Sequence, residues 1–228
     1  MMHPIAHFRT ISEHRHLVCR YCLRLGLIRQ GLTHDLSKYS PEEFWRGARY
    51  YQGYRSPNDA ERAETGMSRA WLHHKGRNKH HFEYWIDWQL NPEGGVYYAG
   101  NKMPMRYVAE MFCDRIAASR VYLKEKYTDA SPYDYLMKGL PDLMMHPDTL
   151  AELEKMLLVL KDEGEDAAGS RERSEGCASS AGRIRRSGEG SERNDAGSGA
   201  APGRSIRPAG RHREGHGGRP GQDHAAGA

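Results

Sequence analysis

Two pairs of adjacent histidines, His73–His74 and His80–His81, lie close together in the segment WLHHKGRNKHHFEYW, residues 71–85. The whole chain of 228 residues has only 13 histidines, so this local density is unusual. Imidazole nitrogens bind transition metals, and they exchange protons near neutral pH. The segment is therefore either a polar stretch of surface or a place where the fold needs several imidazoles together.

Two further side chains of metal-binding chemistry share an expected apolar helix face. His14 lies three residues after Ile11 and four before Val18, so it points with the apolar stripe. Asp114 shares a face with Met111 in the same way, and a buried carboxylate is costly unless it is paired or binds a cation. The simpler interpretations are a hydrogen-bonded core histidine and an ion pair between Asp114 and a nearby arginine.

The dipeptide His34–Asp35, in GLTHDLSK, places an imidazole beside a carboxylate just after the first expected helix. An adjacent His and Asp in a helical turn can bind one metal ion through a ring nitrogen and a carboxylate oxygen. Each feature alone is weak, but a single divalent-metal centre in a helical bundle explains all of them. Mixed His/Asp ligation favours Mn, Fe, Co, Ni or Zn over Ca or Mg, and the number of candidate ligands leaves room for one or two ions.

Helices must position these residues, because apolar residues recur at helical spacing through most of residues 1–164. No run alternates cleanly with a period of two, so we expect an all-α fold, a single compact bundle of five to seven helices. The expected helices cover about residues 4–29, 41–51, 57–90 with a break near Gly66 or Gly76, 103–127, 131–139 and 147–161, with a loop at 91–102. On the third of these, His74 and His81 are seven residues apart and lie on one side, two turns from each other.

Residues 165–228 differ in composition: they contain no Leu, Val, Met, Phe, Trp, Tyr or Lys and consist mainly of Gly, Ala, Ser, Arg and Glu. Such a segment cannot bury enough apolar surface to offset the entropy of ordering it, so we expect a disordered tail after a helical domain of residues 1–164. A genuine flexible tail and a reading-frame error in a GC-rich gene both produce this pattern. The tail arginines would contact nucleic acid only non-specifically.

The remaining composition excludes several classes of protein. The formal net charge is +4, and no apolar run approaches the 18 residues of a membrane span. The N-terminus MMHPIAHFRT lacks the apolar core of a signal peptide. Four cysteines do not make a disulfide framework, and the pair Cys19–Cys22 is best explained by packing. We expect a cytoplasmic protein with no membrane partner.

The order His14, His34–Asp35, histidine pairs and Asp114 resembles the HD-domain superfamily of metal-dependent phosphohydrolases, whose signature is H…HD…D. HDLSK is also similar to the HDIGK form found in part of that superfamily. Over residues 8–140 the chain further resembles an uncharacterised family of small bacterial proteins, through stretches such as GLTHDLSKYSPEEFW and AWLHHKGRNKHHFEYWID. The resemblance implies an HD-like fold and divalent-metal-dependent hydrolysis of a small, nucleotide-like phosphoester.

When the ligands of the superfamily are transferred to the matching motif positions, the resemblance implies metal ligands at His14, His34, Asp35, His74, His81 and Asp114. His74 and His81 would be the extra histidines of the two-metal members, and their neighbours His73 and His80 stay open as alternatives. The spacing from His34–Asp35 to Asp114 is long for the superfamily, which weakens the inference about the substrate more than the inference about the metal.

Three residues would carry the chemistry. Asp35 would bridge the metals or orient the attacking water, and Lys38 would hold a phosphate oxygen. His81 would donate a proton to the leaving group. Glu83 and Glu110 are candidates to anchor a ligand histidine through its other ring nitrogen.

Three other interpretations stay open. The first is a non-catalytic, metal-stabilised helical module, whose site would be closed by four protein ligands. The second is a nuclease of the His-Asn-His type built on His74, Asn78 and His81, which requires a strand hairpin before a helix. The third is that the histidines bind nothing. Neither the substrate nor the oligomeric state can be inferred from the sequence.

Overall fold

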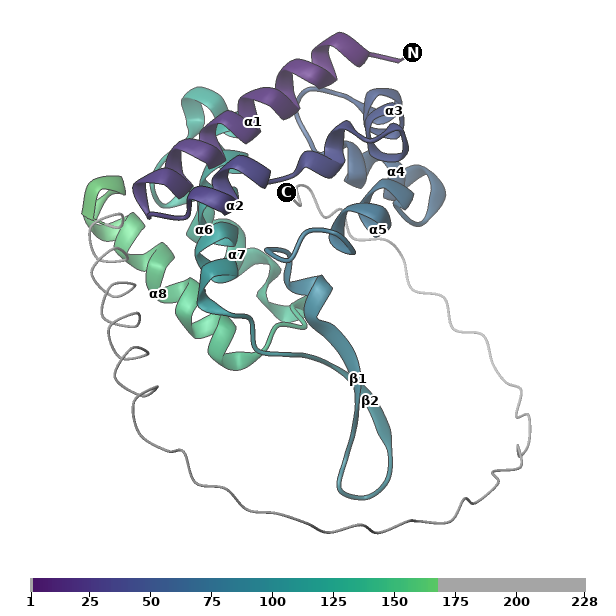
Figure 1. Cartoon of the computed structure of the whole chain (residues 1–228), viewed down its shortest axis with the longest axis vertical. Helices are drawn as coiled ribbons and strands as arrows, with labels where there is room; N and C mark the ends of the chain where they lie inside the picture. Colours follow the sequence, from purple (N-terminus) through teal and green to yellow (C-terminus); the bar gives the residue numbers. More distant parts are fainter. Residues whose placement is uncertain (1, 168–228) are drawn as a thin grey trace, which may run out of the picture.

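The computed structural model describes residues 2–167, which form a helical body and one projecting hairpin (Figure 1). The α-helices are α1 (Pro4–Arg24), α2 (Ile28–Thr33), α3 (Pro41–Tyr50), α4 (Pro57–Thr65), α5 (Arg69–Lys75), α6 (Met105–Leu123), α7 (Ser131–Gly139) and α8 (Pro147–Glu163). Short 3₁₀ helices lie between them: η1 (Leu36–Tyr39), η2 (Phe82–Trp85), η3 (Lys124–Lys126) and η4 (Leu140–Asp142). The mostly helical prediction is confirmed. Most of the expected tail, residues 168–228, lies outside the described residues.

The hydrophobic core lies where α6 packs between α1 and α8. Helix α6 is buried on most sides, as a central helix must be, and it carries the candidate ligand Asp114. The core residues of these three helices include Val18, Tyr21, Cys22, Val108, Phe112, Cys113, Ile116, Ala117, Leu153, Met156, Leu157 and Leu160. On the other side of α1, helices α3, α4 and α5 form a second layer (Figure 1). Helix α1 therefore lies between α6 and the layer that contains α5, the helix with the first histidine pair.

The first expected helix ends earlier than predicted. It stops at Arg24, and Gly26 adopts the left-handed conformation with φ 76° before α2 begins. We expected Gly31 to end the helix, but Gly31 lies inside α2 and has a packing role. A Cβ atom there would lie 3.0 Å from the Cys22 Cβ, so its missing side chain lets α2 pack closely on α1. This packing places the end of α2, with His34, beside α1.

The helix predicted over residues 57–90 is wrong beyond Lys75. It is interrupted at Gly66, where φ is 80°, and α5 restarts after Ser68, whose hydroxyl accepts a hydrogen bond from the Trp71 N–H at 3.0 Å. Both expected breaks, near Gly66 and Gly76, occur. After the second break the chain does not return to an α-helix.

Instead, the chain forms an antiparallel hairpin of β1 (Ile86–Leu90) and β2 (Val96–Gly100), which projects from the helical body (Figure 1). The sequence IDWQL alternates apolar and polar residues, and the following NPEGG is a turn signal, so a period-two pattern was present after all. The loop expected over residues 91–102 therefore contains β2. Register pairs Trp88 with Tyr98 and Leu90 with Val96, which puts these apolar side chains on one face.

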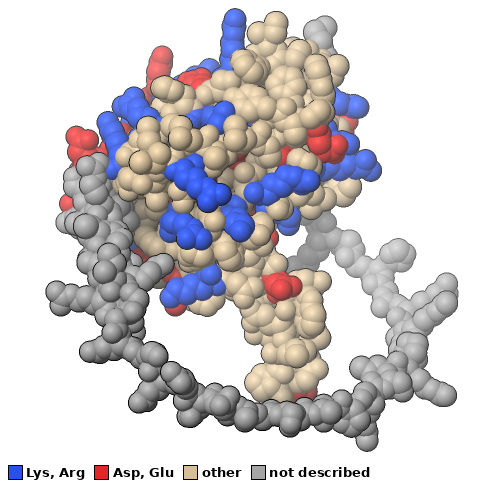
Figure 2. Space-filling model, viewed as in Figure 1, with Lys and Arg blue, Asp and Glu red and all other residues tan. Residues whose placement is uncertain are grey.

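That face of the hairpin is open to solvent. Trp88 and Leu90 are 55% and 69% exposed, and Val96 and Tyr98 are 62% and 67% exposed. Residues 86–100 contain no Lys or Arg, and Figure 2 shows the hairpin as a largely uncharged extension below a body with many cations. None of the helices in the described residues combines the length and apolarity needed to span a bilayer.

Candidate metal centre

The six predicted metal ligands lie in one buried cluster, although they come from distant segments. They are contributed by α1 (His14), the α2–η1 junction (His34 and Asp35), α5 (His74), the loop before η2 (His81) and α6 (Asp114). The first donor group consists of His14, His34, Asp35 and Asp114, and the second consists of Asp35, His74, His80 and His81. Within each group, one ligand atom per residue lies within 4.8 Å of all the others. Because the groups share Asp35, they are adjacent.

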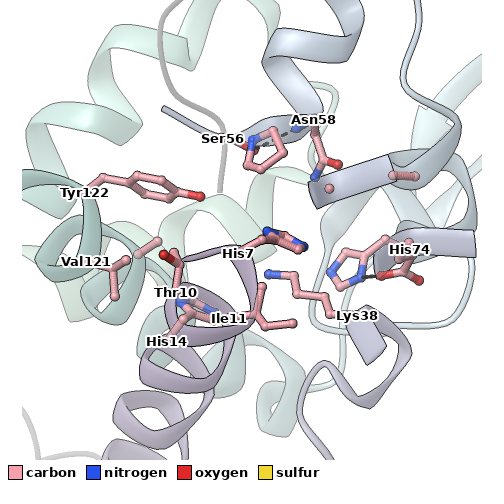
Figure 3. A pocket seen from close by; sticks show the side chains of 15 residues that line it. His7, Thr10, Ile11, His14, Lys38, Ser56, Asn58, His74, Val121 and Tyr122 are labelled. Atoms are coloured by element: carbon pink, nitrogen blue, oxygen red, sulfur yellow. Dashed lines mark hydrogen bonds and ion pairs between the residues drawn. The ribbon is translucent and has the colours of Figure 1, made fainter. Parts of the chain in front are cut away.

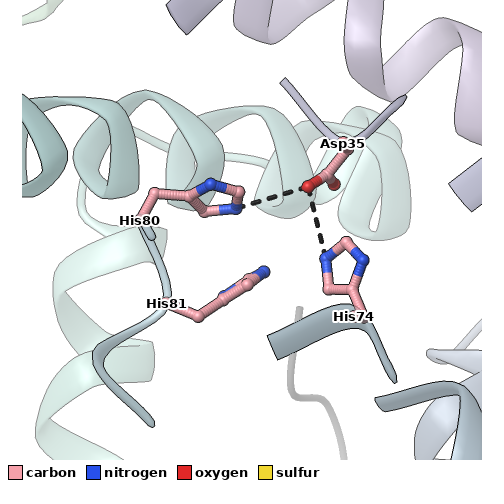
Figure 4. A group of neighbouring side chains, drawn as sticks. All are labelled: Asp35, His74, His80 and His81. Carbon is pink, nitrogen blue, oxygen red and sulfur yellow. Dashed lines mark ion pairs between the residues drawn. The ribbon is translucent and has the colours of Figure 1, made fainter. Parts of the chain in front are cut away.

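Asp35 occupies the centre of the cluster and is fully buried. Its Oδ1 lies 3.2 Å from His74 Nε2 and 3.4 Å from His80 Nε2 (Figure 4). Its Oδ2 lies 3.3 Å from His34 Nε2 and 2.8 Å from Lys38 Nζ. Each carboxylate oxygen thus faces a different set of donors, which suits a bridging position.

The backbone of Asp35 explains how this position is reached. We expected a helical turn, but Asp35 is left-handed, with φ 51° and ψ 27°, and it separates α2 from η1. Aspartate adopts this conformation more often than most residues, because its short polar side chain can form compensating local hydrogen bonds. A fully buried, non-glycine residue in the left-handed conformation indicates that the surrounding structure imposes this backbone conformation, which in turn sets the direction of the Asp35 side chain.

Asp114 is paired with histidines rather than with an arginine. Its Oδ1 lies 2.9 Å from His14 Nε2 and 3.5 Å from His34 Nε2. The contact with His14 is an ion pair whose geometry does not meet that of a hydrogen bond. Arg120, on the same helix, instead donates through its Nε to Glu165 at 3.0 Å. The arginine interpretation of Asp114 is therefore wrong.

The inward-facing atoms of the cluster lack hydrogen-bond partners. This is true of both Asp35 carboxylate oxygens and of the Nε2 atoms of His14, His34, His74, His80 and His81. Most of these atoms contact one another and Lys38 as ion pairs, but a buried polar atom that makes no hydrogen bond costs about 1–3 kcal/mol, so several in one place point to a ligand site. Imidazole nitrogens and carboxylate oxygens are the donors that divalent transition metals take. The residues present therefore fit one or two such ions.

Two glutamates hold the outward-facing ring nitrogens. Glu110 Oε1 lies 3.1 Å from His34 Nδ1 and 3.2 Å from His80 Nδ1. Glu43 Oε2 lies 2.8 Å from His74 Nδ1, and its Oε1 lies 2.6 Å from His73 Nδ1. When Nδ1 donates to a carboxylate, the Nε2 lone pair is left free for a metal and the ring orientation is fixed. Both glutamates are buried, Glu110 at 5% and Glu43 at 5% exposed.

These contacts answer the question of which histidines of the paired segment face the centre. His74, His80 and His81 do, whereas His73 lies outside and contacts Glu43. His80 was only an alternative in the sequence analysis, and it belongs to the second donor group. Of the two anchoring glutamates considered, Glu110 contacts ligand histidines.

The convergence of His74 and His81 does not come from helical stacking. Helix α5 ends at Lys75, where the Asn78 side chain and backbone both donate to the His74 carbonyl, at 2.8 and 3.1 Å. The loop then reverses direction and carries His80 and His81 back toward Asp35. A His-Asn-His nuclease needs a strand hairpin before a helix in the segment that carries these residues. Here the hairpin comes after that segment, so the arrangement that the nuclease interpretation requires is not present in the described residues.

Glu43 was the residue that sequence reasoning missed. It was interpreted only as an acid of the first turn after the N-cap Ser40, and that cap is confirmed by the contact of Ser40 Oγ with Glu43 N–H at 3.4 Å. Its side chain, however, lies on the buried face of α3, four residues before the buried Gly47. An acid on the buried face of a helix is the signal that could have identified it.

The electrostatics show what the cluster does without a cation. Burial alone would lower the pKa of His34, but the charge of Asp35 and its hydrogen-bonding neighbours raise the pKa well above the usual value. The pKa of His74 is likewise raised by Asp35 against the effect of burial. The pKa of Asp35 is held well below its usual range by His34 and Lys38, although burial opposes this. Protons on His34 and His74 thus take the place of positive charge that a metal would supply.

His81 behaves differently from these two histidines. Burial, followed by the charges of His80 and His74, lowers its pKa well below the usual value. Its ring also packs edge-on against Trp71, with the ring centroids 4.7 Å apart. A neutral His81 with a free Nε2 is suited to bind a metal.

Two neighbouring hollows adjoin the cluster. A small one, about 50 Å³, is lined by His14, Lys38 and His74 and reaches Tyr122 and Ser56 (Figure 3). A larger cavity, about 600 Å³, reaches His81 and Asp114. Both are also lined by Asn58, Ala118 and Tyr122, so they are adjacent. The larger volume falls in the range of about 300–1,000 Å³ typical of small-molecule sites.

Comparison with known proteins identifies the family of the chain. Residues 3–159 match DUF5662, a family of unknown function, and the chain belongs to it. No curated protein and no solved structure matches the chain significantly. The match covers α1 through most of α8, and therefore every residue of both donor groups.

Proposed function

We propose that this member of the DUF5662 family is a hydrolase that depends on divalent transition-metal ions and cleaves a phosphomonoester. The observation that carries the proposal is the gathering of five imidazole Nε2 atoms, none of which makes a hydrogen bond, around a buried, left-handed aspartate. The shared aspartate supports two metal positions, one in each donor group. The order of these residues along the chain, H…HD…H…D, supports the HD-like, nucleotide-directed chemistry that the sequence resemblance implies.

When bound, such an ion would polarise a phosphoryl oxygen and acidify a water molecule at neutral pH. In the overall reaction, the water oxygen adds to phosphorus, the ester P–O bond breaks, and the leaving oxygen takes up a proton. Asp35 would orient the attacking water, since its two oxygens face both donor groups.

Lys38 has the position expected of a phosphate-binding residue. Its ammonium lies 2.8 Å from Asp35 Oδ2 and lines the small hollow beside the cluster (Figure 3). The Asp35 charge raises the pKa of Lys38 against the effect of burial, so the ammonium keeps its charge at neutral pH. We assign Lys38 to a phosphoryl oxygen in the small hollow beside the donor groups. We assign His81 to metal binding, because its lowered pKa disfavours the proton that an acid would need.

Access distinguishes this proposal from a closed structural site. The ligands are nearly inaccessible to bulk solvent, as in a metal-stabilised module. Two of them, His81 and Asp114, nevertheless line a cavity large enough for a small molecule. A purely structural site has no need of such a cavity, which favours the enzyme.

The test is elemental analysis of the protein purified without added metal, combined with a phosphoester screen in Mn²⁺ or Ni²⁺. We expect bound metal in the wild type and in His16→Ala, which replaces an exposed histidine of the same helix. His34→Ala and Asp114→Ala should empty the site and abolish hydrolysis. Retained metal without hydrolysis would favour the structural module. A wild type that neither binds these ions nor gains thermal stability from them would overturn both.

A further inference from the structure

The larger cavity has the composition of a site for an organic anion. Aromatic and aliphatic side chains form much of its wall: Trp71, Phe82, Met111, Tyr135, Leu136 and Leu143. The cations that line the cavity differ in whether they are paired with an acid and in how far they are exposed. Arg62 donates to Asp59 Oδ1 at 2.5 Å, so its charge is compensated, and Lys138 is exposed at the surface.

Arg115 is a partly buried cation of this wall that forms no ion pair with any described residue. Its Nε is buried and has no hydrogen-bond partner among the described residues, and its guanidinium lies 6.0 Å from the centroid of the Tyr135 ring. Glu83 and Asp114 also line the cavity, and neither forms an ion pair or a hydrogen bond with Arg115 in the part of the chain that the structure describes. A partly buried guanidinium whose buried Nε makes no hydrogen bond is a suitable binding group for a carboxylate or phosphate.

The position of Arg115 separates it from the reacting phosphoryl group. It follows Asp114 on α6, so its side chain leaves the helix about 100° away from the Asp114 side chain. Arg115 lines the larger cavity but not the small hollow that contains Lys38. Lys38 and Arg115 therefore lie in different hollows, where they would contact different anionic groups.

We propose that the larger cavity binds the organic body of the substrate and that Arg115 pairs with a second anionic group on that body. The substrate class is thus a phosphomonoester with a flat or apolar body and a second negative charge. This inference rests on the proposed function, because the phosphoryl end must lie at the metal centre.

The test uses two pairs of probes that differ in length. One pair is 4-carboxyphenyl phosphate and its methyl ester, and the other is the corresponding pair of carboxybiphenyl phosphates. We expect the wild type to prefer the charged member of at least one pair by about tenfold or more in kcat/KM, the equivalent of one charge-assisted contact. Arg115→Gln should reduce that ratio to about one, mainly through KM, and Arg115→Lys should restore part of it.

Arg106→Gln is the matched control, because Arg106 is an exposed arginine of the same helix that stacks on Tyr107. It should keep the wild-type ratio, and bound metal and melting temperature should be checked in every variant. Equal ratios in the wild type and Arg115→Gln for both pairs would overturn the inference while leaving the hydrolase intact.

A binding measurement separates this inference from the proposed function. Calorimetry with the phosphonate analogues of the same probes reports the anion preference without any turnover. An Arg115-dependent preference in a protein that hydrolyses nothing would support the cavity site and contradict the hydrolase. The absence of any Arg115-dependent preference in binding would contradict the cavity site directly.

Discussion

The candidate metal centre and the β-hairpin depart from the usual distribution of side chains in opposite directions. At the centre, ionisable residues are buried: Asp35 is 0% and His34 is 1% exposed. On the hairpin, large apolar residues face water: Leu90 is 69% and Tyr98 is 67% exposed. Burial of polar groups is costly without partners, whereas exposure of single apolar side chains costs a protein little. The two regions are therefore maintained by different means.

The hairpin is maintained locally. Asn91 and Gly94 close its turn: the Asn91 carbonyl accepts from Gly94 N–H at 3.0 Å, and Gly94 adopts φ 85°. The ladder between β1 and β2 supplies the remaining hydrogen bonds. The centre, in contrast, exists only when α1, α5, α6 and the α2–η1 junction are all in place. Substitutions in the two regions should consequently differ in the size of their effects and in how those effects respond to metal.

The largest effect is expected at Asp35. Asp35→Asn keeps the shape and tolerates the left-handed backbone, but it removes the charge that both donor groups share. We expect more than about 100-fold weaker metal binding, beyond the range typical of outer contacts to ligands. Titration of the metal-free protein with Mn²⁺ measures this. Metal affinity equal to that of the wild type would show that the carboxylate is not a ligand.

A smaller loss is expected at Glu110, which contacts ring nitrogens and not the inward-facing atoms. Glu110→Gln should weaken metal binding by about 10–100-fold, because His34 and His80 lose their anionic anchor. The same titration applies, with Glu42→Gln as the control, since Glu42 is an exposed acid paired with Arg46 on α3. An effect of equal size at Glu42 would indicate a general change of charge.

The pH dependence of stability should distinguish the metal-free from the metal-loaded protein. The pKa values of His34 and His74 are raised on folding, so their protonation stabilises the metal-free fold fully below about pH 6.5 and is lost as pH rises through the raised values. His14 and His81, whose pKa values are lowered, contribute no further change above about pH 7.

Above about pH 7 the metal-free protein should thus lose thermal stability as these protons are released, while added metal should stabilise it increasingly because fewer protons compete. Melting temperatures with and without Mn²⁺ across this range provide the measurement. A difference in melting temperature that shrinks toward high pH would contradict the assignment of these histidines as ligands.

The smallest effect is expected on the hairpin. Leu90→Ala should change the free energy of unfolding by less than about 0.5 kcal/mol, because its side chain is already in water. The same substitution in the core, Leu157→Ala, should cost about 2–5 kcal/mol, since Leu157 is 0% exposed. Denaturant unfolding compares the pair directly. A large cost at Leu90 would mean that the hairpin face is covered in solution.

The sequence was sufficient to predict the helical body and the ligand-bearing positions of long helices. Ile11, His14 and Val18 share a face of α1 as the helical period requires, and Asp114 points inward on α6 as expected. Helical spacing depends only on neighbouring residues, so the face on which a residue lies can be predicted without knowing the tertiary fold.

The parts that failed depend on tertiary contacts or on weak local signals. His80 and His81 reach Asp35 through a loop reversal, which no periodicity describes. The left-handed backbone of Asp35 is likewise set by its surroundings, because aspartate adopts it only occasionally. The hairpin was missed for another reason: five alternating residues, Ile86–Leu90, are a short signal beside a strong run of helix-compatible residues.

The shared contact of Glu110 has a consequence for how the two donor groups respond to movement. One oxygen of this glutamate holds His34, from the first donor group, and His80, from the second. Asp35 joins the same two groups on the inner side. A movement of one imidazole would therefore be passed to the other through a common support, so the two donor groups are mechanically coupled on both their inner and outer sides.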